Sequence, residues 1–497
     1  MDAEVRTGMA APALAGSAPP GEPVSRNQQP FHSGSVTYVA AFDARLCNRQ
    51  RQAPDRGLPM KMRKQAVSLA IMHAADVLQP LLLLPYAGRV LGPSSFGQFA
   101  YALAIGQLAA TIVAYGFHWT AQRRVAFLRH EQTAIASLVA QVMATKAVLF
   151  AAVCLVGLVL AGDVLALSKP TFLCAMLSAA GGIIYPSWLF IGLERAWHAA
   201  VAAVVARLLA LVCFVLMVGS PDQVALAVAI QSAVPVVSGL VCTPFLLPIG
   251  FGGFRSLTLS VIGMQLRNGW RGFLFTAVET ALFTLPVALV GHFAGYVAAG
   301  QYSVAEKFLQ AARIFFRLLM DTFLPRVSYY AHVDPAAGIE LLRRSLFTIA
   351  GGVVISIGMF FIAPYIILFF FGNEFSGAIP FVRAMAIIPL LMNINTFTSN
   401  IFMFSYGYEN EWAALNAFGL LVFLIGSYFL SFIVAEQAIV YAMVTKEVVV
   451  LVVSTGFFLV GGAAVLRTAS APDAGRTQGY LPASRSVPLE HEAGRFQ

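Results

Sequence analysis

A succession of long apolar segments, joined by short polar connections, constrains this chain more than any other feature. A bilayer crossing takes about 20 mostly apolar residues. Twelve segments reach that length, near 66–87, 97–119, 135–160, 171–192, 198–218, 223–248, 270–293, 297–324, 345–371, 377–404, 412–433 and 436–464. Only 11% of the residues are charged, against about 25% in soluble domains. The pattern predicts an all-α polytopic membrane protein and excludes a soluble globular enzyme.

Basic residues are concentrated in alternate connections. Arg123 and Arg124 follow the second segment, Arg255 and Arg267 follow the sixth, and Arg326 follows the eighth. Cytoplasmic connections carry an excess of Lys and Arg, so we expect both termini to lie in the cytoplasm. This topology accounts for the net charge of +9 better than nucleic-acid binding does, because no basic run is long enough to follow a phosphate backbone.

The two halves of the chain share a short motif. Residues 97–102 (GQFAYA) resemble residues 300–305 (GQYSVA), and the same offset aligns Arg123 with Arg326. This offset also superposes the first six segments on the last six. We therefore predict a parallel internal repeat of two six-helix lobes, with substrate between them near the middle of the membrane.

The polar and apolar stretches divide the chain into five parts. Residues 1–64 lack the apolar core of a signal peptide and are predicted to be a disordered cytoplasmic tail, although Met60 or Met62 is an alternative start. The other parts are an N-lobe at 65–250, a cytoplasmic linker at 251–269, a C-lobe at 270–466 and a second disordered cytoplasmic tail at 467–497.

Several motifs resemble those of Wzx-type polysaccharide flippases, in the polysaccharide transporter family of the MOP superfamily. They are residues 84–97 (LPYAGRVLGPSSFG), Tyr115-Gly116-Phe117 with Arg123-Arg124, residues 185–195 (YPSWLFIGLER), residues 302–307 (YSVAEK) and residues 325–328 (PRVS). The resemblance extends over about 65–465, and the long N-terminal tail departs from the family pattern.

This resemblance implies a MATE-like arrangement of twelve helices around a central cavity in the bacterial inner membrane. The implied cargo is an undecaprenyl-pyrophosphate-linked oligosaccharide, moved to the periplasmic leaflet for O-antigen, capsule or exopolysaccharide assembly. Polymerases and glycosyltransferases of the same pathway are the implied partners. We expect alternating access coupled to H⁺ or Na⁺, and a wet, basic cavity between the lobes.

Two other functions are weighed against the flippase. A MATE-like cation or drug antiporter needs an acidic, aromatic cavity, whereas Lys and Arg outnumber Asp and Glu in 65–466 by 19 to 15. A polysaccharide polymerase or glycosyltransferase needs a large outer loop or an acidic outer motif, and residues 88–96 contain no carboxylate. The sequence has no P-loop and no Cys/His metal motif. We expect no enzyme activity, no cofactor and no metal.

Charged groups inside membrane segments are costly and are candidates for function. Glu306, Gln310, Arg313, Arg317 and Asp321 follow one another at spacings of four, three, four and four, which places them on one helix face. That face cannot contact lipid tails. One interpretation is that Arg313 and Arg317 bind the pyrophosphate as bidentate donors; the other is that Arg317 only pairs with Asp321.

Further substrate-binding candidates lie elsewhere in the two lobes. Lys307 lies beside the charged stripe, and Lys146 and Arg207 lie in segments 3 and 5, where each has the alternative of pairing with a carboxylate. Asn393 and Asn400 belong to a polar stripe in segment 10. That stripe suits sugar hydroxyls, but we favour hydrogen bonding between helices.

Cation coupling requires an acid within the membrane. Asp76 and Glu279 lie in the first helix of each lobe and correspond at the repeat offset. A desolvated carboxylate carries a proton or ligates sodium, and the alternative is a buried acid bonded to a neighbouring helix. Glu306 and Asp321 of the charged stripe complete the predicted coupling set.

Overall fold

The computed structural model describes residues 60–129, 131–162, 164–247 and 258–469, which belong to one compact unit beginning at Met60. The predicted tails fall outside these residues, apart from Met60–Lys64 and residues 467–469, which are helical. Only helices and turns occur in the described part of the chain, so the all-α prediction is confirmed.

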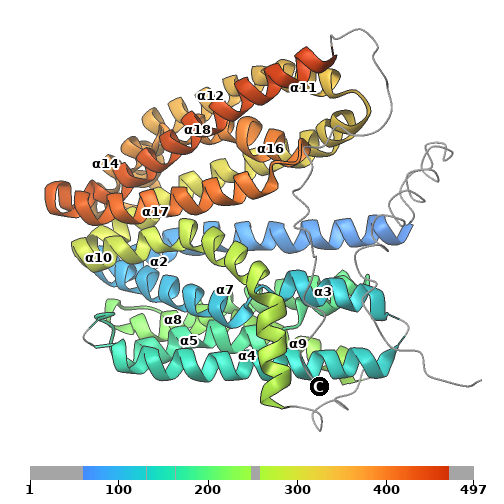
Figure 1. Cartoon of the computed structure of the whole chain (residues 1–497). Helices are drawn as coiled ribbons and strands as arrows, with labels where there is room; N and C mark the ends of the chain where they lie inside the picture. Colours follow the sequence, from blue (N-terminus) through green and yellow to red (C-terminus); the bar gives the residue numbers. More distant parts are fainter. Residues whose placement is uncertain (1–59, 130, 163, 248–257, 470–497) are drawn as a thin grey trace, which may run out of the picture. The chain divides into compact units, whose positions relative to one another are not determined.

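The N-terminal half consists of helices that run back and forth (Figure 1). Their bounds are α2 (Met60–Ala114), α3 (Phe117–Leu128), α4 (Gln132–Leu160), α5 (Lys169–Ile184), α6 (Ser187–Gly192), α7 (Ala196–Met217), the 3-10 turn η1 (Pro221–Gln223), α8 (Val224–Ser232) and α9 (Val234–Leu246). Helix α5 starts where the Ser168 side chain accepts a hydrogen bond from the Thr171 amide and a proline follows, a favourable N-terminal arrangement.

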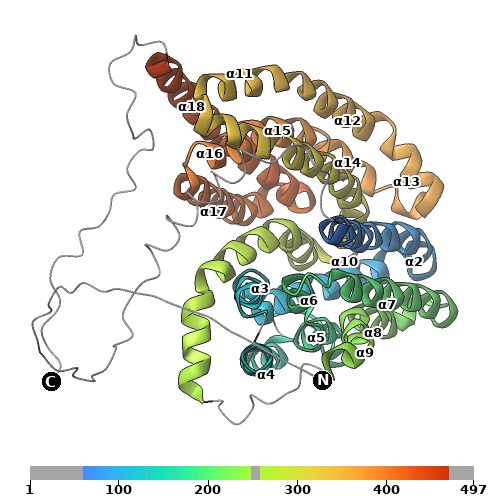
Figure 2. The same cartoon turned by 90° about the vertical axis from the view of Figure 1, so that its right-hand side faces the viewer.

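The C-terminal half repeats this pattern, with α11–α18 grouped on the other side of α2 and α10 (Figures 1 and 2). Its elements are α10 (Leu259–Val333), α11 (Pro335–Ser345), η4 (Leu346–Thr348), α12 (Ile349–Phe361), α13 (Ala363–Phe371), η5 (Asn373–Phe375), α14 (Ala378–Met385), α15 (Ile388–Asn395), the π-helical turn η6 (Thr396–Ile401), α16 (Phe402–Ser405), α17 (Glu409–Val434), η7 (Ala435–Gln437) and α18 (Ala438–Ala469). Helix α10 begins inside the predicted linker, capped by the Thr258 hydroxyl.

Ten helical runs of the described chain are long and apolar enough to cross a membrane. Two of them, Val67–Leu128 with 62 residues and Leu259–Val333 with 75, are far longer than the ~30 Å hydrocarbon core requires at 1.5 Å per residue. Both contain one non-helical glycine, Gly92 (φ 70°) and Gly295 (φ 83°). Each run therefore bends at its glycine and supplies two crossings, in agreement with about twelve spans.

The surface of the helices supports the membrane assignment. Large apolar side chains are exposed on α2, α4, α7, α12, α17 and α18, among them Leu82, Leu155, Leu216, Val354 and Phe432. Exposed apolar patches of this extent are rare in soluble monomers, whereas lipid tails cover them without cost. The chain is a multi-pass membrane protein.

The two bent helices meet through glycines of the shared motif. A Cβ atom on Gly97 would lie 1.6 Å from the Tyr296 carbonyl oxygen, and a Cβ atom on Gly300 would lie 2.3 Å from the Pro93 carbonyl oxygen. Each hairpin thus presses its backbone against the other in a reciprocal contact. Gly92 and Gly295 are separated by the same 203 residues as Gly97 and Gly300, as a parallel repeat requires.

Side chains extend this contact towards α13. The Arg89 guanidinium donates hydrogen bonds to the carbonyl oxygens of Phe370 (2.7 Å) and Phe369 (2.6 Å), which lie at the C-terminus of α13, where a cation is favoured. The Phe96 ring lies edge-on to Phe375 with centroids 5.6 Å apart. We name the set Arg89, Phe96, Gly97, Gly300 and Phe375 the hairpin seal.

Candidate functional site

A cavity of about 600 Å³ lies between the two halves of the described chain. Its wall comes from α2, α5, α8 and α9 of the first half and from both arms of α10 of the second. The central cavity expected between the lobes is therefore present. Phe96 of the hairpin seal lines it, so the seal adjoins the cavity.

Hydroxyl and amide groups form most of the polar lining. They are Gln107, Thr111, Ser178, Gln231, Ser232, Thr276, Thr280, Thr284, Ser303 and Gln310. Phe99 and Phe283 contribute aromatic surface. Such a wall offers donors, acceptors and ring faces to an uncharged, hydroxyl-rich molecule.

Two polar atoms of this wall are buried without a partner in the described structure, Nε2 of Gln231 and Oγ of Ser232. The Gln231 side chain is held by its other end, because its Oε1 accepts a hydrogen bond from Gln79 at 3.1 Å. An unsatisfied buried group costs about 1–3 kcal/mol. Both atoms are buried in this conformation, so cargo can supply a partner only when these side chains turn towards the cavity.

The expectation of a basic cavity is not met. Among the lining residues that the structure describes, one acid, Glu306, and one base, Lys307, carry charge. The Lys307 ammonium donates to Gln310 Oε1 at 3.2 Å. The positive residues of the core lie mostly at the connections and not in this wall, because neutral side chains fill the inner faces of α2 and α10.

Arg313 lies behind the wall and is held by two neighbours. Its guanidinium is 4.0 Å from the buried Glu306 carboxylate and lies over the Phe283 ring, 4.1 Å from the centroid, an attractive arrangement. Its Nε has no partner within the described residues. Arg313 is thus neutralised mainly by Glu306 and is not among the cavity-lining residues.

The rest of the predicted stripe lies beyond the cavity. Arg317 and Asp321 are exposed, and within the described chain no ion pair joins them. Residues 306–321 extend over about 22 Å of helix and their face drifts by about 60°. The stripe is therefore longer than the cavity, and its C-terminal residues lie outside the cavity lining.

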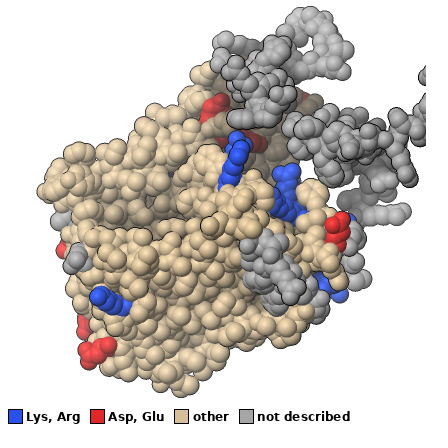
Figure 3. Space-filling model, turned by 60° about the horizontal axis from the view of Figure 1, so that its bottom comes forward, with Lys and Arg blue, Asp and Glu red and all other residues tan. Residues whose placement is uncertain are grey.

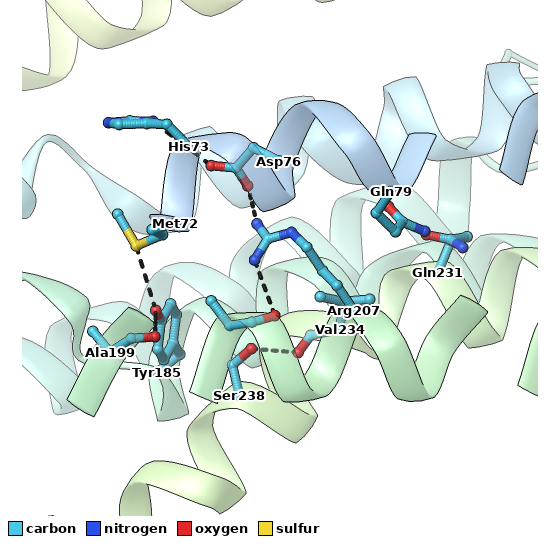
Figure 4. Close-up of polar contacts among 11 residues, drawn as sticks. Met72, His73, Asp76, Gln79, Tyr185, Ala199, Arg207, Gln231, Val234 and Ser238 are labelled. Atoms are coloured by element: carbon cyan, nitrogen blue, oxygen red, sulfur yellow. Dashed lines mark hydrogen bonds and ion pairs between the residues drawn. The ribbon is translucent and has the colours of Figure 1, made fainter. Parts of the chain in front are cut away.

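In the N-lobe, Arg207, a predicted substrate-binding residue, contacts Asp76, a predicted coupling acid (Figure 4). Arg207 forms an ion pair with Asp76, and its other terminal nitrogen donates to the Ala203 carbonyl at 3.1 Å. Asp76 also lies 3.8 Å from His73. Neither Arg207 nor Asp76 lines the cavity. Glu279, the repeat counterpart of Asp76, is exposed, and the described residues provide no cation for it.

Lys146 is buried against the cavity wall. Its ammonium donates to the Gly182 carbonyl oxygen at 2.8 Å, and Gly182 itself lines the cavity. Lys146 therefore stabilises the wall from behind in this structure.

The polar stripe of segment 10 contacts neighbouring helices. Asn393 donates to the Thr348 carbonyl at 3.3 Å, Asn400 accepts from the Trp412 indole at 2.9 Å, and Asn395 donates to the Glu447 carboxylate at 2.8 Å. Neither Asn393 nor Asn400 lines the cavity. These contacts agree with the favoured interpretation, and a role for either residue in cargo binding stays a prediction.

Sequence reasoning missed the neutral lining. Thr276, Thr280 and Thr284 recur every four residues in the first arm of α10, and Gln107 and Thr111 do so in α2. This spacing places each set on one helix face, so a search for hydroxyl stripes, and not for charge alone, would have found them.

Comparison with known proteins identifies the class and then the family. The fold is similar to solved MOP-superfamily transporters. One is a structure described as the inward-facing conformation of a multidrug resistance MATE family transporter (TM-score 0.61, 16% identity, 82% of this chain and all of that one). Another is the MATE multidrug transporter DinF-BH in complex with R6G (TM-score 0.51, 14% identity, 82% of this chain and 98% of that one). The chain therefore shares the helical fold of these membrane proteins and has a cavity of mixed polar and apolar lining between its halves.

Sequence comparison is more specific. Residues 62–330 match the model of the polysaccharide biosynthesis protein family, and the chain belongs to this family. Two relatives carry the name "Putative O-antigen transporter". The one from Shigella dysenteriae is 24% identical over 395 residues, 78% of this chain and 98% of that protein. The one from Escherichia coli K12 is 24% identical over 375 residues, 74% and 89% of the two chains. The resemblance to Wzx-type flippases is confirmed.

Proposed function

We propose that the protein is a flippase, which moves a polyprenyl-pyrophosphate-linked oligosaccharide from the cytoplasmic to the periplasmic leaflet of the bacterial inner membrane. The observation that carries the proposal is the set of ten hydroxyl and amide side chains in the cavity wall, which alternate with apolar residues such as Leu84 and Phe99. Sugar hydroxyls cannot enter hydrocarbon unaccompanied, because each unpaired polar group costs several kcal/mol. The O-antigen transporter names of the relatives support this cargo.

Movement requires that the cavity open to one side at a time. The hairpin seal closes one end through the Gly97–Gly300 contact, and loop charges predict that this end is periplasmic. Separation of the two hairpins would release the sugar outward while the lipid tail remains in the bilayer. The same distribution of loop charges predicts that both termini lie in the cytoplasm.

An ion gradient resets the empty carrier in this proposal. Glu306 is the predicted coupling acid that lines the cavity, and its carboxylate lies 4.0 Å from the Arg313 guanidinium of the same helix. Asp76, Glu279 and Asp321 remain candidates outside the cavity lining. Either H⁺ or Na⁺ satisfies a buried carboxylate.

The second candidate is a cation or drug antiporter, favoured by the presence of one acid, Glu306, and two aromatic residues, Phe99 and Phe283, in the same cavity wall. This arrangement would attract an organic cation. The two candidates differ in cargo and are separated by direct transport assays.

The test is a leaflet assay in cells that lack the gene. We expect lipid-linked oligosaccharide to accumulate on the cytoplasmic face and the wild-type gene to restore translocation. Accumulation of unpolymerised units on the periplasmic face would instead indicate a polymerase. Normal oligosaccharide translocation, together with loss of efflux of a fluorescent cationic dye, would establish the antiporter.

A further inference from the structure

A second hollow, of about 270 Å³, lies at the junction of α3 with the first arm of α10. Its lining includes two adjacent arginines, Arg123 and Arg124, and two amides, Gln265 and Asn268. In Figure 3 the few Lys and Arg side chains on the face shown are separated from one another, with Asp and Glu side chains also near both ends, and most of that face carries no charge. The charge rule alone treats these arginines as topology determinants.

The charges of this hollow are not neutralised by acids. Arg124 donates to Gln265 Oε1 at 3.2 Å, and Gln265 donates in turn to Gln141 at 2.8 Å. Gln265 is 3% exposed, so a buried amide chain fixes the guanidinium without cancelling its charge. Arg123 lies 6.0 Å from the centroid of the Phe127 ring. No carboxylate of the described residues lines the hollow or lies within ion-pair distance of either arginine.

The hollow lies at the depth where lipid phosphates are expected. Trp119 on α3 is 55% exposed and Trp270 on α10 is 51% exposed, and exposed tryptophans of membrane proteins concentrate at the headgroup level. Phe127, 75% exposed, gives the hollow an apolar rim. A ligand with a phosphate and an acyl or prenyl tail would satisfy both features.

One contact separates this hollow from the cavity. The rings of Tyr115 and Phe273 stack with centroids 4.7 Å apart, and a Cβ atom on Gly116 would lie 2.3 Å from the Gly272 carbonyl carbon. Ala114 lines the cavity on one side of this contact, while Thr120 and Gly269 line the hollow on the other. An anion in the hollow would therefore lie next to the end of the cavity that the loop charges predict to be cytoplasmic.

We propose that the Arg123–Arg124 hollow binds the diphosphate of the cargo lipid, while the sugar occupies the neutral cavity. Two guanidinium groups offer bidentate, charge-assisted hydrogen bonds to phosphate oxygens. This arrangement places the anionic diphosphate beside two arginines and the uncharged sugar beside the mostly neutral cavity wall. This inference rests on the proposed function, because an unrelated transporter would have no diphosphate lipid to bind.

The test measures binding to purified full-length protein in nanodiscs made with zwitterionic lipid. The probes are undecaprenyl diphosphate and, separately, phosphatidylglycerol. We expect the double variant Arg123→Ala with Arg124→Ala to weaken undecaprenyl diphosphate binding at least tenfold and phosphatidylglycerol binding much less. The variant with Arg123→Lys and Arg124→Lys should be intermediate, because Lys keeps charge without the bidentate fork.

The control is Arg343→Ala with Arg344→Ala, which removes an adjacent, exposed arginine pair from α11, where Arg344 pairs with Glu340. It should leave undecaprenyl diphosphate binding unchanged, and size-exclusion profiles should agree among all variants. Equal losses for both lipids would assign the hollow to a bilayer lipid and overturn the proposal, as would unchanged binding in the double variant. If the leaflet assay shows translocation in either case, the flippase function stands without this site.

Discussion

At the residue scale, Ser232 shows that a buried polar group of the cavity wall lowers the stability of the protein when it has no hydrogen-bond partner. The residue is 2% exposed, and its hydroxyl has no hydrogen-bond partner within the described structure. A group of this kind destabilises the empty protein by about 1–3 kcal/mol. Its retention in the wall is understandable if cargo completes its hydrogen bonding.

We expect Ser232→Ala to leave thermal stability unchanged or slightly higher, while the rate of oligosaccharide translocation falls several-fold. The Ser232 hydroxyl makes no hydrogen bond within the described protein, so removing it costs no stability. The cargo, by contrast, loses a hydrogen-bond partner. Melting temperature in detergent and the leaflet assay measure the two effects. Ser238→Ala is the control, because that hydroxyl donates to the Val234 carbonyl within its own helix. A drop in stability with normal transport would contradict the binding role.

Glu306 and Arg313 lead to a second prediction. Breaking a buried ion pair from one side costs about 3–5 kcal/mol, because the remaining charge is uncompensated. Glu306→Gln and Arg313→Gln should each lower the melting temperature, and the double variant should recover much of the loss. Additive losses would show that the pair does not interact. If the recovered double variant also translocates cargo at the normal rate, both residues are dispensable for binding and coupling.

Sequence reasoning found the individual charges but not their partners. It placed Asp76, Arg207, Glu306 and Arg313 in the membrane and weighed pairing against function. Arg207 and Asp76 are 131 positions apart, and such a contact depends on how α7 packs on α2. The hollow of Arg123 was missed because its pocket forms only when α3 meets α10.

At the element scale, α2 and α10 determine how the two halves meet. Each bends at a glycine with positive φ, a conformation that costs other residues strain, and each contributes a motif glycine to the reciprocal contact. Repeated motifs and span lengths predicted these two helices well, since both features are local in sequence. The break between α12 and α13 has a local signal in Pro364, at the start of α13, whereas the π-helical turn η6 has no comparable one.

We expect Gly97→Ala and Gly300→Ala to lower stability by about 1–3 kcal/mol each, as overpacking does, because the new methyl groups would overlap carbonyl oxygens. Gly456→Ala is the matched control, since a Cβ there meets nothing within 4 Å and alanine favours a helix. Unfolding followed by intrinsic fluorescence measures the difference. Equal behaviour of the three variants would show that the hairpins do not press together in the membrane.

At the scale of the whole molecule, Arg89 connects the first half to the second through two backbone carbonyls of α13. Hydrogen bonds to a charged donor contribute about 1.5–3 kcal/mol when sheltered, and less here because the arginine is exposed. Loss of this link should shift the population towards a state with an open hairpin seal.

The shift is measurable by cysteine labelling. In a background with all five cysteines replaced by alanine, Ser303→Cys reports on the cavity. We expect Arg89→Ala to raise its labelling rate by a membrane-impermeant thiol reagent applied outside, up to about tenfold. Lys169→Ala removes an exposed charge from the same predicted side and should have no effect. An unchanged labelling rate with Arg89→Ala would show that the Arg89 hydrogen bonds do not hold the hairpin seal closed.

The reciprocal contact between Gly97 and Gly300 makes the fit between the two halves largely independent of the side chains that line the cavity. Its closest atoms belong to the main chain of both hairpins, so the fit of one half against the other depends little on which side chains surround it. The groups that face the cavity are mostly neutral, and apart from Phe96 none of them belongs to the hairpin seal. For the proposed oligosaccharide cargo, substitutions in the cavity wall would change which sugar is recognised, while this main-chain contact between the halves would stay the same.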